Sequence, residues 1–464
     1  MRVTLTCLLV ACMLFFSACA PKPPKAASKT PEELDSLARS FVLSMAAGRY
    51  DEASKTFTKQ MAAAMPASKL GELWSALLTQ GGRWQQIANT RFAEESGYRV
   101  VYVTAAFENG SIDIKVVFDD EAKVAGLWLG AFQPALASSQ YTAPVYVKED
   151  SFTEQEVVVG QGQWALPGTL TMPKGEGPFP AVVLVHGSGP LDRDETIGPN
   201  KPFKDLAWGL ASKGIAVLRY EKRTKHYAAE MKNVQNMTVK EETIDDAVAA
   251  VALLKETPGV DPERVFLIGH SLGAMLAPRI AEECLASPHT RIAGIVMLAP
   301  ASRDLLDVIL EQAEYLAGLD GTISEAESRE IEAIKTEVEK IRSGKLREGE
   351  LALNAPKSYW DDLAAYDGVE IAGELGLPML ILQGERDYQV TMEDLQGWED
   401  GLLKPGEANV RTNVSIKTYK DLNHLFISGT GKSTPDEYLI PGHVSEEVIT
   451  DISNWVRTTG EAGD

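Results

Sequence analysis

The chain has 464 residues, of which 44% are hydrophobic and 24% are charged, values that are ordinary for a folded globular protein. Its formal net charge of −21 at pH 7 argues against a nucleic-acid partner, because nucleic-acid binding requires a basic surface. The length is sufficient for two or three domains.

Residues 1–19 have the features of an export signal. A short positive start at Met1-Arg2 precedes an apolar run over residues 3–16, which is too short to span a bilayer as a helix. The sequence Phe16-Ser17-Ala18-Cys19 resembles a bacterial lipobox, which implies lipidation of Cys19 and membrane anchoring in the cell envelope. Cleavage at the A-x-A site Ala18-Cys19-Ala20, giving a soluble periplasmic or secreted protein, is the alternative.

Removal of this segment takes Cys7 and Cys12 with it and leaves Cys284 as the one cysteine of the folded part. An intrachain disulfide is therefore excluded. Cys284 follows a helical apolar pattern, so we predict that it is a buried apolar side chain.

Residues 20–31 are rich in Pro, Lys and Ser and predict a linker, after which residues 32–133 form a small α+β domain. Thr30 is a plausible N-cap for the first helix, and Asn109-Gly110 is typical of a hairpin turn. The periodicity predicts helices from Pro31 to about residue 47, over 52–65 and over 69–78, and strands over 84–92, 98–107, 111–118 and 124–129. This arrangement resembles NTF2-like domains, and it either binds a ligand or acts as a spacer.

Residues 134–145 predict a second linker, and residues 146–464 a domain in which strands and helices alternate. We predict an antiparallel strand pair over 146–159 and 164–172, parallel strands over 181–185, 215–219, 265–268, 294–298, 379–382 and 414–418, and helices over 204–213 and 241–255. This alternation is typical of a mostly parallel sheet covered by helices on both faces. The charged helical run over 302–366 interrupts it, either as a cap over the active site or as a surface hairpin.

The sequence Gly269-His270-Ser271-Leu272-Gly273 lies between a predicted strand and a helix-prone segment. This is the context that the Gly-x-Ser-x-Gly nucleophile elbow requires. A serine hydroxyl is a weak nucleophile unless a base lies beside it, and the tight turn exposes Ser271 for that purpose. We therefore predict that Ser271 is the nucleophile.

The predicted base and acid follow the last two strands of the sheet. His424 comes after the strand over 414–418, and Asp387 after the strand over 379–382, so both lie at the carboxyl edge where ligands bind. The order Ser271, Asp387, His424 is that of an α/β-hydrolase triad. His443 as the base and Glu385 as the acid remain alternatives.

An acyl-transfer site also needs an oxyanion hole. The small residues of His186-Gly187-Ser188-Gly189-Pro190 follow the strand over 181–185, and we expect the N–H groups of Ser188 and Leu272 to hold the oxyanion. Gly187, His270 and Trp360 are predicted to border the substrate, although Trp360 could instead only pack the cap. We expect His186 to be structural and His270 to brace the site. A metal site at Asp192-Arg193-Asp194-Glu195 is disfavoured, because two of its residues would pair with Arg193.

Several stretches resemble the α/β-hydrolase superfamily. They are residues 186–190, 192–195 and 269–273, quoted above, together with 201–207, 218–224, 384–387 and 423–424. The similarity is greatest to exported bacterial carboxylesterases that carry an NTF2-like domain of the DUF3887 type. The resemblance implies hydrolysis of short-chain carboxylic esters through an acyl-enzyme, without metal or cofactor. A serine exopeptidase or deacylase acting on peptides or cell-envelope components is the alternative, and a non-catalytic, lipid-tethered binding protein is a second. Oligomeric state cannot be deduced from the sequence.

Overall fold

The computed structural model describes residues 29–459, except 96–97, 109, 131, 135–140, 232–233, 235 and 404–412. The chain forms two compact units, residues 1–135 and 136–464. Cys19, the predicted signal segment, most of the first predicted linker and half of the second lie outside the described residues. Within the described part, no helix combines the length and the apolar character needed to cross a membrane.

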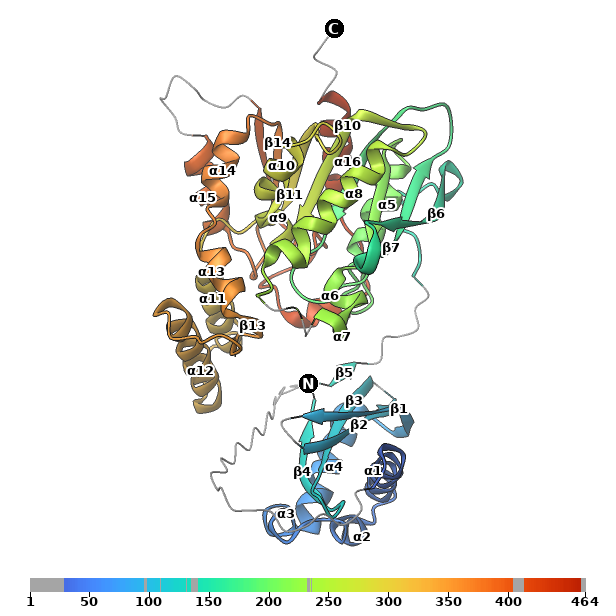
Figure 1. The fold of residues 1–464 in the computed structure, drawn as a ribbon, viewed down its shortest axis with the longest axis vertical. Coiled ribbons are helices and arrows are strands. Elements are labelled where there is room, and N and C mark those ends of the chain that lie inside the picture. The colour runs from blue at the N-terminus through green and yellow to red at the C-terminus, as the bar shows by residue number, and fades with distance from the viewer. Residues whose placement is uncertain are drawn as a thin grey trace. The chain divides into compact units, whose positions relative to one another are not determined.

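The first unit packs helices against one face of an antiparallel sheet (Figure 1). Helix α1 begins with a capping box, in which Thr30 and Glu33 each bond the other's backbone N–H, and it buries Leu34, Phe41 and Met45 against the sheet. The elements of this unit are α1 Pro31–Ala46, α2 Tyr50–Ser54, α3 Lys59–Ala64, α4 Ala67–Gly81, β1 Trp84–Glu95, β2 Tyr98–Phe107, β3 Gly110–Phe118, β4 Val124–Leu129 and β5 Gln133–Pro134. The four predicted strands are confirmed.

The single helix predicted over 52–65 is wrong, because the segment is divided between α2 and α3. Thr58 lies between them, where its N–H bonds the carbonyl of Val124 at 3.0 Å and its side chain caps α3 at Met61 N. A threonine that can cap a helix competes with helix continuation, so the chain turns at this position.

The second unit contains an eight-stranded sheet in the order β15-β14-β11-β10-β8-β9-β7-β6. The six strands from β15 to β9 are parallel, whereas β7 pairs antiparallel with both β9 and β6. The strands are β6 Phe152–Val159, β7 Leu166–Pro173, β8 Phe179–Val185, β9 Ala216–Tyr220, β10 Val260–His270, β11 Gly294–Leu298, β14 Met379–Gly384 and β15 Val414–Tyr419. The predicted fold class is confirmed, although the first strand begins at Phe152 rather than at residue 146.

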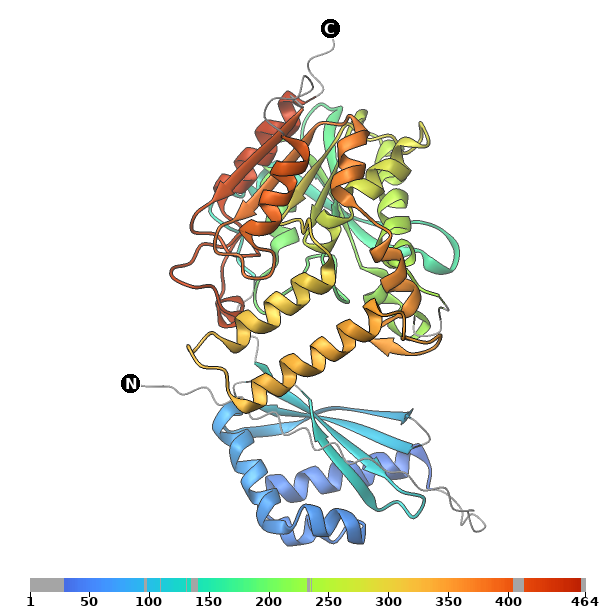
Figure 2. The same ribbon diagram turned by 90° about the vertical axis from the view of Figure 1, so that its left-hand side faces the viewer.

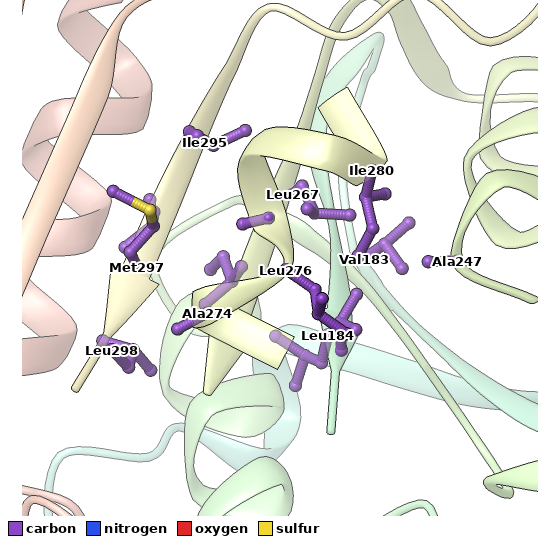
Figure 3. Close-up of a cluster of buried hydrophobic side chains, with 14 of the residues drawn as sticks. Val183, Leu184, Ala247, Leu267, Ala274, Leu276, Ile280, Ile295, Met297 and Leu298 are labelled. Carbon is purple, nitrogen blue, oxygen red and sulfur yellow. The ribbon is translucent and has the colours of Figure 1, made fainter. Parts of the chain in front are cut away.

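Helices cover both faces of this sheet. Helices α5 and α16 pack together, and α8, α10 and α14 pack in a row with α15 outside them. The helices are α5 Pro202–Ala211, α6 Arg223–His226, α7 Ala228–Met231, α8 Asp245–Lys255, α9 Leu272–Met275, α10 Ala277–Leu285, α14 Gly368–Leu375, α15 Met392–Leu402 and α16 Glu446–Thr458, with short 3₁₀ turns at Glu149–Ser151, Gly162–Trp164 and Pro435–Leu439. Figure 3 shows Val183, Leu267 and Ile295 of three neighbouring strands beneath Leu276 and Ile280. Cys284 is buried in this core, as predicted.

A π-helical turn, Lys240–Ile244, leads into α8. Turns of this kind are rare and occur often beside functional sites. The turn buries Glu242, Thr243 and Ile244 in succession.

The predicted cap consists of α11 Leu305–Ala317, α12 Glu325–Arg342, the hairpin β12 Leu351–Ala352 with β13 Ala355–Pro356, and α13 Lys357–Ala364. It is inserted between β11 and β14, and Figure 2 shows α11 and α12 as two long helices running side by side away from the sheet. Ile331 and Val338 are the buried residues through which α12 packs, and most of its remaining side chains are exposed or partly exposed.

Candidate active site

Ser271 occupies a strained turn between β10 and α9, with φ 52° and ψ −117°. A non-glycine residue at positive φ is uncommon and persists only where the surrounding structure enforces it. The flanking glycines are required by space, since a Cβ at Gly269 would lie 2.3 Å from Gly273 O, and one at Gly273 would lie 2.4 Å from Val185 O. The strand–turn–helix context predicted for Ser271 is therefore confirmed.

His424 and Asp387 form a buried pair at the carboxyl edge of the sheet. Nδ1 of His424 lies 2.6 Å from Oδ2 of Asp387, and the two residues are 3% and 6% exposed. The other carboxylate oxygen of Asp387 accepts backbone N–H bonds from Gln389 at 2.8 Å and Val390 at 3.1 Å. A carboxylate fixed in this way holds the imidazole in one tautomer, with Nε2 free to act as a base.

The alternative acid and base do not share this geometry. Glu385 accepts a hydrogen bond from Thr418 at 2.8 Å, while Asp387 is the carboxylate bonded to His424. His443 pairs instead with Asp205 at 3.1 Å.

The predicted base lies beside the turn that carries Ser271. Nε2 of His270, the residue before Ser271, is 2.9 Å from the backbone oxygen of His424, and the two imidazole rings have their centroids 4.7 Å apart. The acid and base loops are also in close contact, since a Cβ at Gly384 would lie 2.5 Å from Leu422 O. Residues distant in the sequence thus meet at one edge of the sheet.

The loop after β8 borders the elbow, as expected for an oxyanion hole. A Cβ placed on Gly187 would lie 3.1 Å from Cβ of Ser271. The N–H of Gly187 bonds Oε1 of Glu195 at 2.7 Å, so it is not available to a substrate. Within the described part of the chain, the N–H groups of Ser188 and Leu272 have no protein partner. These two donors are the ones predicted for the oxyanion, and that role stays a prediction.

A buried lysine fixes the same loop from its other side. Nζ of Lys222 donates to the carbonyl oxygen of Gly187 at 2.7 Å and lies 2.7 Å from Oε1 of Glu242. Lys222 is 2% exposed and Glu242 is 6% exposed. Both backbone groups of Gly187 are therefore bonded within the protein, and its contribution to substrate binding is limited to the space that a missing side chain leaves. Lys222 lies in the stretch 218–224 that carries the resemblance, but no pattern in the sequence assigned a role to it or to Glu242.

His186 has the structural position predicted for it. Its Nε2 lies 2.9 Å from the backbone oxygen of Asp192, and its ring packs on Phe203 and Tyr220. Burial lowers the pKa of His186 to about 4, so the ring is neutral at pH 7 and Nε2 carries the proton that the carbonyl accepts.

His270 is also turned inward. Its Nδ1 lies 2.9 Å from Oε2 of Glu195, and its Nε2 lies against the backbone of His424. Nε2 is bonded to the backbone and Nδ1 faces a buried carboxylate, so the structure favours the expected bracing role of His270 over a polar contact with substrate.

The acidic run from Asp192 to Glu195 serves as a set of ion-pair partners. The expected pairing with Arg193 is wrong, because Arg193 contacts Glu221 at 2.9 Å, whereas Asp194 contacts Arg219 at 2.9 Å and Lys201 at 2.8 Å. No group of three metal-ligating side chains with the geometry of a metal site occurs among the described residues.

Two tyrosines of the inserted segment contact residues near the predicted site. The Tyr315 ring of α11 stacks on Tyr388, the neighbour of Asp387, with centroids 5.1 Å apart. The hydroxyl of Tyr366 donates to the carbonyl of Met275 at 2.6 Å, one turn after Ser271. Trp360 is 5% exposed and donates to Ala352 O at 2.9 Å inside the cap, so its place in an acyl pocket stays a prediction.

A family model described as serine aminopeptidase, S33, matches residues 178–428, which is more than half of the chain. The chain belongs to the S33 family of α/β-hydrolases. A model for a family of unknown function, DUF3887, matches residues 38–127, so this S33 hydrolase carries the N-terminal domain type that the resemblance implied.

The S33 hydrolase is 42% identical over 416 residues to Esterase EstD of Thermotoga maritima, a match that covers 90% of the chain and 93% of the relative. It is 27% identical over 228 residues to Esterase FrsA of Shigella dysenteriae, which covers 49% of each. Among solved structures, a hyperthermophilic esterase of Pyrobaculum calidifontis aligns with 14% identity and a TM-score of 0.44, covering 67% of this chain and 87% of that one.

Proposed function

We propose that this protein is a serine carboxylesterase that hydrolyses short-chain esters through an acyl-enzyme. The observation that carries the proposal is the strained Ser271 of the elbow beside the buried His424–Asp387 pair. The extended similarity to an esterase supports carboxylic esters as the substrate class.

In the proposed reaction, Oγ of Ser271 attacks the ester carbonyl while Nε2 of His424 takes its proton. The N–H groups of Ser188 and Leu272 stabilise the oxyanion that forms on the carbonyl oxygen. His424 then gives the proton to the leaving alcohol. A water molecule, deprotonated by His424, attacks the acyl-enzyme, and the carboxylic acid leaves as Ser271 recovers its proton. Asp387 holds His424 and stabilises its charged form throughout.

Peptide or amide hydrolysis is the second candidate, because the matching family model is described as a serine aminopeptidase. An aminopeptidase must bind the free amine of its substrate, and carboxylates in the cap could do so. The two candidates use the same nucleophile and differ in the leaving group, so direct comparison of substrates separates them.

The test uses the mature protein and Ser271→Ala with p-nitrophenyl acetate and butyrate, and with aminoacyl anilides in parallel. We expect ester hydrolysis that the substitution lowers by at least about 10³-fold, and little anilide hydrolysis. Full activity in the variant would refute the nucleophile, and faster turnover of anilides would favour the aminopeptidase. Labelling of Ser271 by a fluorophosphonate probe separates both from a non-catalytic binding protein, in which this serine would not react.

We also propose that the protein is exported and anchored to a membrane by lipid on Cys19. The support is the order of charged, apolar and small residues in the first 19 positions. In a bacterial host, the full chain should incorporate labelled fatty acid and partition into detergent, whereas Cys19→Ser should do neither. A Cys19→Ser protein that still carries the label would rule out this anchor.

A further inference from the structure

Glu195 is an unusual residue in the loop between β8 and α5. It is 1% exposed and has φ 52°, so a carboxylate is buried on a strained backbone. A tight turn imposes this conformation, since Glu195 N bonds Asp192 O at 2.9 Å and the Asp192 side chain accepts from Thr196 N at 2.9 Å. Burying a charge and straining the backbone both cost free energy, and such costs concentrate at functional sites.

The two oxygens of Glu195 contact two different parts of the candidate site. Oε1 accepts the N–H of Gly187 at 2.7 Å, and Oε2 lies 2.9 Å from Nδ1 of His270. One carboxylate thus connects the loop of residues 186–190, the oxyanion loop, to His270, which precedes Ser271. The N–H of Ser188 shares a peptide plane with the carbonyl of Gly187, which Lys222 bonds, while Glu195 holds Gly187 through the preceding peptide plane.

His270 extends this connection to the base. Its Nε2 contacts the carbonyl oxygen of His424, which can only accept a hydrogen bond, and its Nδ1 faces a carboxylate, which when ionised is also only an acceptor. An ionised Glu195 thus favours a proton on both nitrogens, which makes His270 an imidazolium. Burial disfavours that charge, but the carboxylate of Glu195 outweighs it and raises the pKa of His270.

The same balance applies to the carboxylate. Burial disfavours ionised Glu195, but the charge and proximity of His270 and the N–H of Gly187 outweigh it, and the pKa of Glu195 is lowered. The other groups near the pair are Asp387, whose charge also favours the imidazolium, the ring of His424, and His186, which interacts with Glu195.

We propose that Glu195 and His270 form a buried carboxylate–imidazolium pair that holds the oxyanion loop and the base loop in register around Ser271. Glu195 is then a positioning residue of the hydrolytic reaction. This inference rests on the proposed function, because it assigns the pair to the same site, but the charge state of the pair can be measured without any substrate.

The variant Glu195→Gln preserves shape and removes the charge. Its amide oxygen can still accept from Gly187, but its NH₂ group faces Nδ1, so His270 must lose a proton while keeping its bond to His424. If Glu195 is a positioning residue, Glu195→Gln should weaken transition-state stabilisation rather than substrate binding, because only the developing oxyanion depends on the loop that contains Gly187 and Ser188.

The experiment compares Glu195→Gln with wild type and with Glu156→Gln, a matched carboxylate-to-amide control. Glu156 is exposed and contacts Arg193, outside the site. Hydrolysis of p-nitrophenyl butyrate is normalised to the number of serines labelled by a fluorophosphonate. For Glu195→Gln we expect kcat to fall about 10- to 100-fold with KM changed less than about threefold, and binding of a trifluoromethyl ketone, which forms an oxyanion on Ser271, to weaken in parallel. The control should match wild type.

The charge state is read from nitrogen-15 NMR of the wild-type histidines, assigned with a set of single His→Gln variants. His270 should show two protonated nitrogens at pH 7, and this signature should disappear in Glu195→Gln. A neutral His270 in wild type overturns the proposal, even if Glu195→Gln fails to fold. An unchanged kcat per labelled serine in a folded Glu195→Gln overturns it as well. Wild-type protein without esterase activity would instead refute the proposed function.

Discussion

Nδ1 of His424 lies 2.6 Å from Oδ2 of Asp387, and backbone N–H groups hold the other oxygen of that carboxylate. Because an amide in place of the carboxylate would favour the wrong tautomer of the imidazole, Asp387→Asn should lower kcat for ester hydrolysis by about 10³- to 10⁴-fold, with the fold intact. Glu385→Gln is the control, since Glu385 contacts Thr418 instead. Steady-state kinetics decide, and comparable losses in the two variants would contradict the assignment of the acid.

Gly187 should tolerate no side chain. A Cβ there would lie 3.1 Å from Cβ of Ser271 and 3.3 Å from Oε1 of Glu195, so Gly187→Ala displaces the oxyanion loop by a few tenths of an ångström. We expect kcat to fall about 10- to 100-fold, because misplacement of this size disturbs reaction geometry.

The matched control for Gly187→Ala is Gly373→Ala in α14, where a Cβ meets nothing within 4 Å. This control should keep full activity and gain about 0.5–1 kcal/mol in free energy of unfolding, because alanine is favoured over glycine inside a helix. Urea denaturation and kinetics on both variants test the pair. A fully active Gly187→Ala would show that the loop does not border the reacting atoms.

Buried His186 should make the protein less stable in acid. Its pKa is lowered to about 4 by burial, so between pH 6.5 and 4 the unfolded chain binds a proton that the folded chain does not. The neutral ring makes its full contribution to the free energy of unfolding above about pH 6.5. This contribution is lost as the pH falls, and the loss amounts to about 3 kcal/mol near pH 4. Urea unfolding at several pH values should show a steeper acid loss for wild type than for His186→Gln. Parallel curves would contradict the prediction.

The stacked rings of Tyr315 and Tyr388 should anchor α11 of the cap. The hydroxyl of Tyr315 also donates to Ser433 O at 2.8 Å. Tyr315→Phe removes only that bond and should cost about 1 kcal/mol, whereas Tyr315→Ala also removes the ring pair and should cost about 1 kcal/mol more. Amide hydrogen exchange of Leu305–Ala317 reports the effect locally. Equal exchange in both variants would exclude the ring pair as the anchor.

The sheet and the three predicted catalytic residues could be read from the sequence because each follows an apolar strand, and parallel strands end at one edge. The partners of those residues could not be read in the same way. Glu195 was considered only as part of an acidic run, because nothing in a linear sequence joins it to His270, 75 positions later. The pairing of His443 with Asp205 was hidden for the same reason. The break between α2 and α3 at Thr58 shows that a residue able to cap a helix can end it even where the apolar periodicity continues.

The π-helical turn before α8 gives the chain one extra residue at Lys240–Ile244, and Glu242 lies within it. Deleting a single residue there would restore regular helix and rotate the preceding side chains by about 100° around the axis. Glu242 would then point away from Lys222, and the ammonium group that bonds the carbonyl of Gly187 would be left without its counter-ion. The geometry around Ser271 therefore depends on a one-residue insertion in a helix. This insertion lies some fifty positions along the chain from the loop that contains Gly187.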